Sequence, residues 1–155
     1  MENKDNIIIS IHPRYASKID SGEKIYEIRT RKLHIQDGTR VWIYRTLPEA
    51  CVSSTAIVQT VICISPANAW KKYSKCMCIA KNDFDNYTKD RKEIYLLKIS
   101  DVAPLRKALT LNELRKKIPP FFPPQFFKRL NPKEEIMMAL LEEFTPSRKR
   151  KTPKK

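Results

Sequence analysis

Four residues near the start of the chain combine side chains that could bind a negatively charged ligand. Gly22, Lys24, Glu27 and Arg29 form the pattern G-x-K-x-x-E-x-R within the stretch SGEKIYEIRTRK. A lysine and an arginine can neutralise a phosphate, and a carboxylate can accept hydrogen bonds from the amino group of a base. For an isolated E-x-R pair, however, a solvated ion pair on a strand is the simpler interpretation. Both interpretations stay open at this level.

The geometry of a strand decides which of these side chains lie together. Residues two apart on a strand share a face. If Tyr26 and Ile28 pack into the core, Glu27 and Arg29 lie side by side and face outward. Lys24 begins the strand on the other face and can swing over its end.

Short elements surround this pattern and continue along the chain. The apolar run NIIISI predicts a buried strand, and Pro13 fits the first turn of a helix that ends before Gly22, where a left-handed residue is wanted. Further expected strands cover 24–31, 40–45, 52–64 and 93–100, and expected helices cover 65–73, 81–87, 110–118 and 131–144. The segment PPFFPPQFF, 119–127, has four prolines and should pack on the body without regular structure. Without regular β-α alternation, these elements predict an α+β domain with a mixed sheet curled into a small barrel.

Composition and charge indicate one domain with a polyanionic partner. The 155 residues carry 31 Lys and Arg against 17 Asp and Glu, a formal charge of +14. Six of the basic residues lie in the last eleven positions, but the excess extends into the body of the chain. We expect a domain over 1–130, a C-terminal helix over 131–144 and a disordered basic tail over 145–155. Nucleic acid is the favoured partner.

The same composition argues against several other classes of protein. The polar start and the absence of a long apolar run predict a soluble, cytoplasmic protein without a membrane partner. Four cysteines with neither disulfide nor zinc spacing, and only two histidines, predict no metal site. We expect no cofactor, and the sequence leaves the oligomeric state open.

The stretch SIHPRYASKIDSGEKIYEIRTRK resembles the start of an ASCH domain, a branch of the PUA-like superfamily. That family has G-x-K-x-x-E-x-R after a helix, matched here by Gly22, Lys24, Glu27 and Arg29. The similarity continues through RVWIYRTLP, the AW helix, FDNYTKDRKEIYLLKI and PPQFF, and covers about residues 6 to 130. Similar domains usually have further glycines where this chain has CVSST and KCMCI, a difference that concerns loops more than the fold.

The resemblance implies a small β-barrel with a cleft lined by the pattern residues, a fold proposed to bind RNA or modified nucleosides. On this basis, nucleic-acid or ligand binding is expected of six residues: Lys24, Glu27, Arg29, Tyr15, Trp42 and Arg45. Tyr15, Trp42 or Tyr44 could supply a stacking face for a base. Trp42 and Tyr44 share one strand face, however, and could equally belong to the core.

A binding module is the leading interpretation, and a small metal-independent hydrolase acting on RNA or a modified nucleoside is the alternative. If the chain is an enzyme, Lys24 and Glu27 are its expected catalytic residues. Some ASCH-like proteins hydrolyse an acylated cytidine with a lysine, a threonine and a glutamate. Lys24 fits the lysine, but the threonine would fall at Glu27, which weakens that reaction. Cleavage of RNA would need a base near a 2′-hydroxyl and a cation on the phosphate, and Glu27 with Lys24 or Arg29 could provide both.

Overall fold

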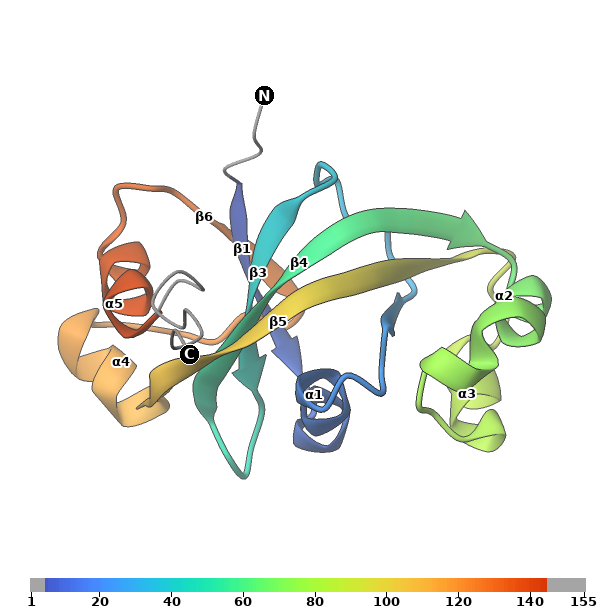
Figure 1. Cartoon of the computed structure of the whole chain (residues 1–155), viewed down its shortest axis with the longest axis horizontal. Helices are drawn as coiled ribbons and strands as arrows, with labels where there is room; N and C mark the ends of the chain where they lie inside the picture. Colours follow the sequence, from blue (N-terminus) through green and yellow to red (C-terminus); the bar gives the residue numbers. More distant parts are fainter. Residues whose placement is uncertain (1–4, 145–155) are drawn as a thin grey trace, which may run out of the picture.

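A mixed sheet of six strands forms the body of the computed structural model, which describes residues 5–144. The strands are β1 Asn6–Ile11, β2 Tyr26–Arg29, β3 Thr39–Arg45, β4 Cys51–Ile64, β5 Ile94–Thr110 and β6 Phe127–Leu130. They stand in the order β2-β5-β4-β3-β1-β6, with β1 and β3 parallel and the other neighbours antiparallel. The sheet curls into a half-barrel (Figure 1), which confirms the expected α+β class.

Short helices cover the ends and the middle of this sheet. They are α1 Pro13–Asp20, α2 Pro66–Tyr73, α3 Lys81–Tyr87, α4 Leu111–Lys117 and α5 Glu135–Glu143, with a 3-10 turn at Ser74–Cys76. In Figure 1, α2 and α3 lie at one end of the long strands β4 and β5, and α4 and α5 lie at the other. The helix α1 lies between these two groups, and its buried residues pack against β3 and β5.

The long strand β4 covers the range expected from the sequence, and the long strand β5 is longer than expected. β4 is rich in β-branched residues and forms one long strand over nearly the expected range 52–64, with bulges in its pairing to β5. β5 continues ten residues past its expected end at Ser100. Asp101 and Pro104 look like strand breakers, but neither ends the strand. Asp101 has a φ of 52° and lies in a bulge where the pairing register shifts, and Pro104 keeps a regular place opposite Ser54.

The two faces of the sheet bury different clusters of apolar side chains. On β1, Ile7 and Ile9 enter a cluster with α1, whereas Ile8 points to the opposite side with Trp42 and Tyr44. That opposite cluster also contains the apolar faces of α4 and α5. A third cluster joins the ends of β2 and β5 to α2 and α3. The alternation of inward and outward residues along each strand therefore builds a core on both sides of the sheet.

The turn from α1 into β2 sets the position of the G-x-K-x-x-E-x-R pattern. Pro13 occupies the first turn of α1, and the side chain of His12 accepts a hydrogen bond from the backbone N–H of Arg14. Gly22 has a φ of 86°, which confirms the left-handed residue expected at the end of α1. The backbone N–H of Lys24 then donates to the carbonyl of Lys18, so the chain enters β2 close against the helix.

The C-terminal part of the described chain agrees with the sequence in outline. The capping box of Thr110 and Glu113 starts α4 as expected. The last helix, expected over 131–144, forms as α5 Glu135–Glu143. Its first turn begins later than expected, because Asn131 forms a hydrogen-bonded turn with Lys133 and Glu134 in front of the helix.

The proline-rich segment 119–127 packs along the body, and β6 starts at its last residue. Phe121 is buried, Phe126 and Phe127 are half-buried, and Phe122 is exposed. The backbone N–H of Ser10 donates to the carbonyl of Phe126, so the segment extends the edge of the sheet beside β1. The expected basic tail over 145–155 lies outside the described residues.

Residues 5–144 contain neither a membrane-spanning helix nor a cluster of metal-binding side chains. No helix in this range is long and apolar enough to cross a membrane. No group of three or more His, Cys, Asp or Glu side chains in the same range is placed to hold a metal ion. The four cysteines are free thiols.

Candidate ligand-binding pocket

A pocket of about 520 Å³ opens where the ends of β1 and β2 meet α1 and α3. Its volume lies within the roughly 300–1,000 Å³ of small-molecule sites. Lys24, Glu27 and Arg29 line it together, with Tyr15 from α1 and Tyr87 from α3. The structure therefore brings together four of the six residues expected from the sequence.

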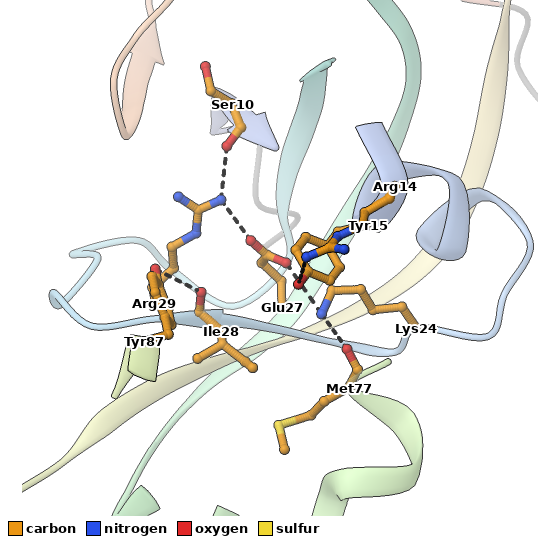
Figure 2. A network of polar contacts seen from close by, with 9 residues as sticks. All are labelled: Ser10, Arg14, Tyr15, Lys24, Glu27, Ile28, Arg29, Met77 and Tyr87. Atoms are coloured by element: carbon orange, nitrogen blue, oxygen red, sulfur yellow. Dashed lines mark hydrogen bonds and ion pairs between the residues drawn. The ribbon is translucent and has the colours of Figure 1, made fainter. Parts of the chain in front are cut away.

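A continuous row of polar contacts crosses the floor of this pocket (Figure 2). The ammonium of Lys24 donates to the carbonyl of Met77 at 2.6 Å and lies 3.6 Å from Oε1 of Glu27. The guanidinium of Arg29 donates to Oε2 of Glu27 at 2.7 Å and to the carbonyl of Ser10 at 3.0 Å. One carboxylate thus stands between two cations, and the row carries a net charge of +1.

The strand geometry expected for β2 holds, but its polar face is not open to solvent. Glu27 and Arg29 share a face, while Ile28 is buried on the other face against α2 and α3. Glu27 is 7% exposed and Lys24 is 3% exposed, far below the exposure of an ordinary solvated strand face. The solvated ion pair considered from the sequence is therefore wrong, because α1 and α3 enclose this side of β2.

Burial changes the proton affinity of Lys24. Removal of its ammonium from water lowers the pKa of Lys24, and the negative charge of Glu27 opposes this effect only in part. The net direction is downward from the ordinary value of 10.5. Lys24 therefore gives up its proton more readily than a solvated lysine does.

Two residues of α1 form one side of the pocket. The ammonium of Lys24 lies 5.2 Å from the centre of the Tyr15 ring, and the guanidinium of Arg14 lies 4.9 Å from it. Arg14 also donates to the Tyr15 hydroxyl at 3.1 Å, as Figure 2 shows. Tyr15 thus contacts two cations and lines the pocket.

The opposite side comes from α3, and the sequence reasoning did not assign it to the site. Asp83, Asn86 and Tyr87 line the pocket from this helix. The Tyr87 hydroxyl donates to the carbonyl of Ile28 at 3.4 Å, and burial raises the pKa of Tyr87. The helix itself was expected, and FDNYTKDRKEIYLLKI carried part of the family resemblance. That match was the available signal for these residues.

The segment 119–127 contacts Ser10 and Arg29, two residues that line the pocket. The Ser10 hydroxyl donates to the carbonyl of Pro124 at 2.6 Å, and the Ser10 carbonyl accepts from Arg29. The guanidinium of Arg29 also lies 5.2 Å from the centre of the Phe126 ring. The orientation of Arg29 thus depends on residues about a hundred positions away in the chain.

Trp42 and Tyr44 do not line the pocket, which corrects the expectation of a stacking face on β3. Trp42 is fully buried in the cluster shared with α4 and α5, and its indole N–H donates to Oδ1 of Asn6. Tyr44 is 2% exposed in the same cluster. The alternative that both belong to the core is confirmed.

Arg45 does not line the pocket either. Its guanidinium contacts Asp20 at 2.5 Å and Glu49 at 3.0 Å, and donates to the hydroxyls of Ser17 and Ser53. These contacts tie the end of β3 to α1 and to the start of β4. The structure therefore gives Arg45 a bracing position in place of the expected ligand contact.

The half-barrel has the fold of an ASCH domain of the PUA-like type, as the sequence resemblance indicated. The chain belongs to the family described as Domain of unknown function (DUF365), whose model matches residues 5–120.

Known proteins agree with this assignment. A protein of Zymomonas mobilis named ASCH domain-containing ribonuclease is 25% identical over 139 residues, which cover 90% of this chain and 93% of the relative. The crystal structure of ASCH from Zymomonas mobilis has a TM-score of 0.82 at 25% identity, over 90% of this chain and 96% of that one. Human THYN1, solved in complex with DNA containing 5-methylcytosine, has a TM-score of 0.54 at 11% identity, over 92% and 100% of the chains. The likeness to THYN1 is one of fold.

Proposed function

We propose that this protein binds RNA and takes one nucleotide into the pocket. The observation that carries the proposal is the row of Lys24, Glu27 and Arg29 at the floor of a cavity large enough for a nucleoside, with side chains 11% exposed or less, in a chain of charge +14. Long-range attraction to phosphate brings the strand to the protein, and the pocket then selects what enters.

Buried charges of this kind are hard to explain by folding alone. Each ion taken out of water costs several kcal/mol, and well-packed apolar residues often replace a buried ion pair without loss of stability. Among the described residues, Arg29 also has a buried Nε without a hydrogen-bond partner. A site that binds a polar ligand is a reason to keep such a costly arrangement.

The walls of the pocket suit a flat, polar ring. Ile11 and Ile79 supply apolar surface, and Tyr15 and Tyr87 supply aromatic rings with hydroxyl groups. Such side chains stack on a base and bond to its edge, which is the usual way in which unpaired RNA bases are recognised. The relative from Zymomonas mobilis is named a ribonuclease, and this favours RNA among the nucleic acids.

The test is a binding panel over single-stranded RNA, duplex RNA, DNA and modified nucleosides, measured by fluorescence anisotropy and calorimetry. Arg29→Ala should weaken RNA binding at least about tenfold, because a cation is lost and Glu27 then repels the strand. Arg106→Ala removes an exposed arginine near α5 and is the matched control, with an expected change below about twofold. Equal effects of the two variants would contradict a specific site in the pocket.

Cleavage of RNA is a second candidate, and the lowered pKa of Lys24 favours it. Glu27 would accept the proton of a 2′-hydroxyl, whose oxygen attacks the adjacent phosphorus. The bond from phosphorus to the 5′-oxygen breaks, and the ammonium of Lys24 protonates the leaving oxygen. The products are a 2′,3′-cyclic phosphate and a 5′-hydroxyl.

This reaction makes a distinct prediction about products and variants. A cleaved strand should carry a 2′,3′-cyclic phosphate by mass spectrometry, a 2′-deoxy substitution at the cut should block it, and EDTA should not. Lys24→Ala should reduce cleavage at least about a hundredfold while binding persists. Cleavage that survives in Lys24→Ala would exclude this role for Lys24.

A further inference from the structure

A second, smaller cavity of about 150 Å³ adjoins the main pocket on the side of α1. Both cavities are lined by Arg14, Tyr15, Ile79 and Asp83. The smaller cavity adds Lys18, which lies one helical turn after Arg14 on α1. The two spaces are therefore neighbours across a shared wall, and the wall carries a guanidinium.

The cations of the smaller cavity are held only weakly by the protein itself. Lys18 lies 3.0 Å from Glu23, with side chains 50% and 59% exposed. Arg14 lies 3.6 Å from Asp83, with side chains 64% and 50% exposed. Exposed pairs of this kind contribute little to stability, so an incoming anion can take over either cation.

The size of the smaller cavity restricts what it can hold. Its volume is well below the roughly 300–1,000 Å³ of pockets for whole small molecules. A phosphate group fits such a space, and lysine and arginine are the side chains that bind phosphate. The neighbouring pocket has more than three times the volume, lined by aromatic and apolar groups.

We infer that the smaller cavity binds a phosphate attached to the nucleoside in the main pocket, through Lys18 and Arg14. The ligand is then a nucleotide or a nucleic-acid strand, and not a free nucleoside. This inference rests on the proposed function, because it assigns the group next to the one that the pocket takes. Arg14, which lines both cavities, lies where the sugar joins the phosphate.

The test compares ligands with and without phosphate by calorimetry: the four ribonucleosides, their 3′- and 5′-monophosphates, and homopentanucleotides of RNA and DNA. The wild-type protein should bind one series of monophosphates at least about fivefold more tightly than the nucleosides. Lys18→Met should remove most of this advantage and leave nucleoside binding within about twofold. The monophosphate series that responds, 3′ or 5′, gives the direction of the strand.

Lys107 provides a matched control at the other end of the molecule. It forms a 3.0 Å ion pair with Glu113, as Lys18 does with Glu23. Lys107→Met removes the same charge and should keep the phosphate advantage. Conversely, Glu23→Gln frees Lys18 and should strengthen monophosphate binding about twofold, whereas Glu113→Gln should not.

The outcomes separate this inference from the proposed function. If nucleosides bind and phosphate adds no affinity, the second cavity is not a phosphate site. The same conclusion follows if Lys18→Met and Lys107→Met have equal effects. In both cases the main pocket still binds the nucleoside, and the proposed function is kept. If the wild-type protein binds none of the nucleosides, nucleotides or pentanucleotides, the proposed function fails and this inference fails with it.

Discussion

Two charge clusters lie close to α1, and their opposite composition separates a candidate site from a structural brace. In the pocket, one carboxylate, Glu27, lies between two cations, Lys24 and Arg29. At the end of β3, one cation, Arg45, lies between two carboxylates, Asp20 and Glu49. The pocket cluster thus has an excess of positive charge that faces a cavity, and the brace has none. Buried charge alone therefore does not indicate a binding site. The net charge of the cluster and its contact with a cavity distinguish the candidate site from the brace.

The two clusters also differ in how far their side chains are exposed to solvent. The Asp20 and Glu49 side chains are 34% and 47% exposed, so water screens the brace. All three side chains of the pocket row are 11% exposed or less. The pocket row therefore depends far more on internal charge balance than the brace does.

The largest expected effect breaks that balance. Glu27→Ala leaves two buried cations without their carboxylate and should lower the free energy of unfolding by about 3–5 kcal/mol. Glu49→Ala leaves Arg45 with Asp20 and water, so its cost should stay within about 1 kcal/mol. Urea unfolding of both variants measures the difference, and equal costs would contradict the contrast between the two clusters.

A smaller effect on stability should follow from removing one hydrogen bond that helps to position Arg29 or Arg45. Ser10→Ala removes the 2.6 Å hydrogen bond to the carbonyl of Pro124, behind Arg29, and Ser53→Ala removes a 3.1 Å bond to Arg45. Each change should cost about 1 kcal/mol of stability. Only Ser10→Ala should also weaken RNA binding, by about two- to threefold, because only Arg29 faces the pocket. Anisotropy titrations of RNA with the two variants measure this difference. Weaker RNA binding by Ser53→Ala would mean that the Arg45 cluster also contributes to the binding site.

The smallest expected effect is a change of stability with pH, and the sign of this change tests whether Lys24 is buried as an ammonium. The pKa of Lys24 is lowered from 10.5, so the unfolded chain binds its proton more tightly than the folded protein does. The cost of burying the ammonium is fully present below the folded pKa. It is progressively relieved as pH rises from that value toward 10.5. Wild-type protein should therefore gain stability relative to Lys24→Met across this window.

Lys18 provides the opposite case for the same experiment. Its hydrogen bond and ion pair with Glu23 raise the pKa of Lys18 above 10.5. Its stabilising contribution is present below 10.5 and is lost as pH rises through the folded pKa. Unfolding titrations of wild type, Lys24→Met and Lys18→Met over this alkaline range should show slopes of opposite sign. Parallel slopes would contradict the charged burial of Lys24.

Much of the local structure could be predicted from the sequence because it rests on short-range chemistry. Pro13 and Gly22 bound α1, Thr110 and Glu113 start α4, and alternation places Glu27 beside Arg29. Where a local signal has two outcomes, the prediction failed. Asp101 can end a strand or sit in a bulge, and only the pairing partner β4 selects the bulge.

The set of side chains that share a face of β2 follows from the order of residues alone, because the two-residue period of a strand is a property of the backbone. The enclosure of this face into a pocket depends on packing between distant segments. The contacts that enclose it are long-range: Lys24 meets Met77 53 positions later, and Ser10 meets Pro124 114 positions later. Likewise, the face shared by Trp42 and Tyr44 is as apolar as a stacking surface and turned out to be core. Periodicity tells which residues lie together, and packing between distant segments decides what covers them.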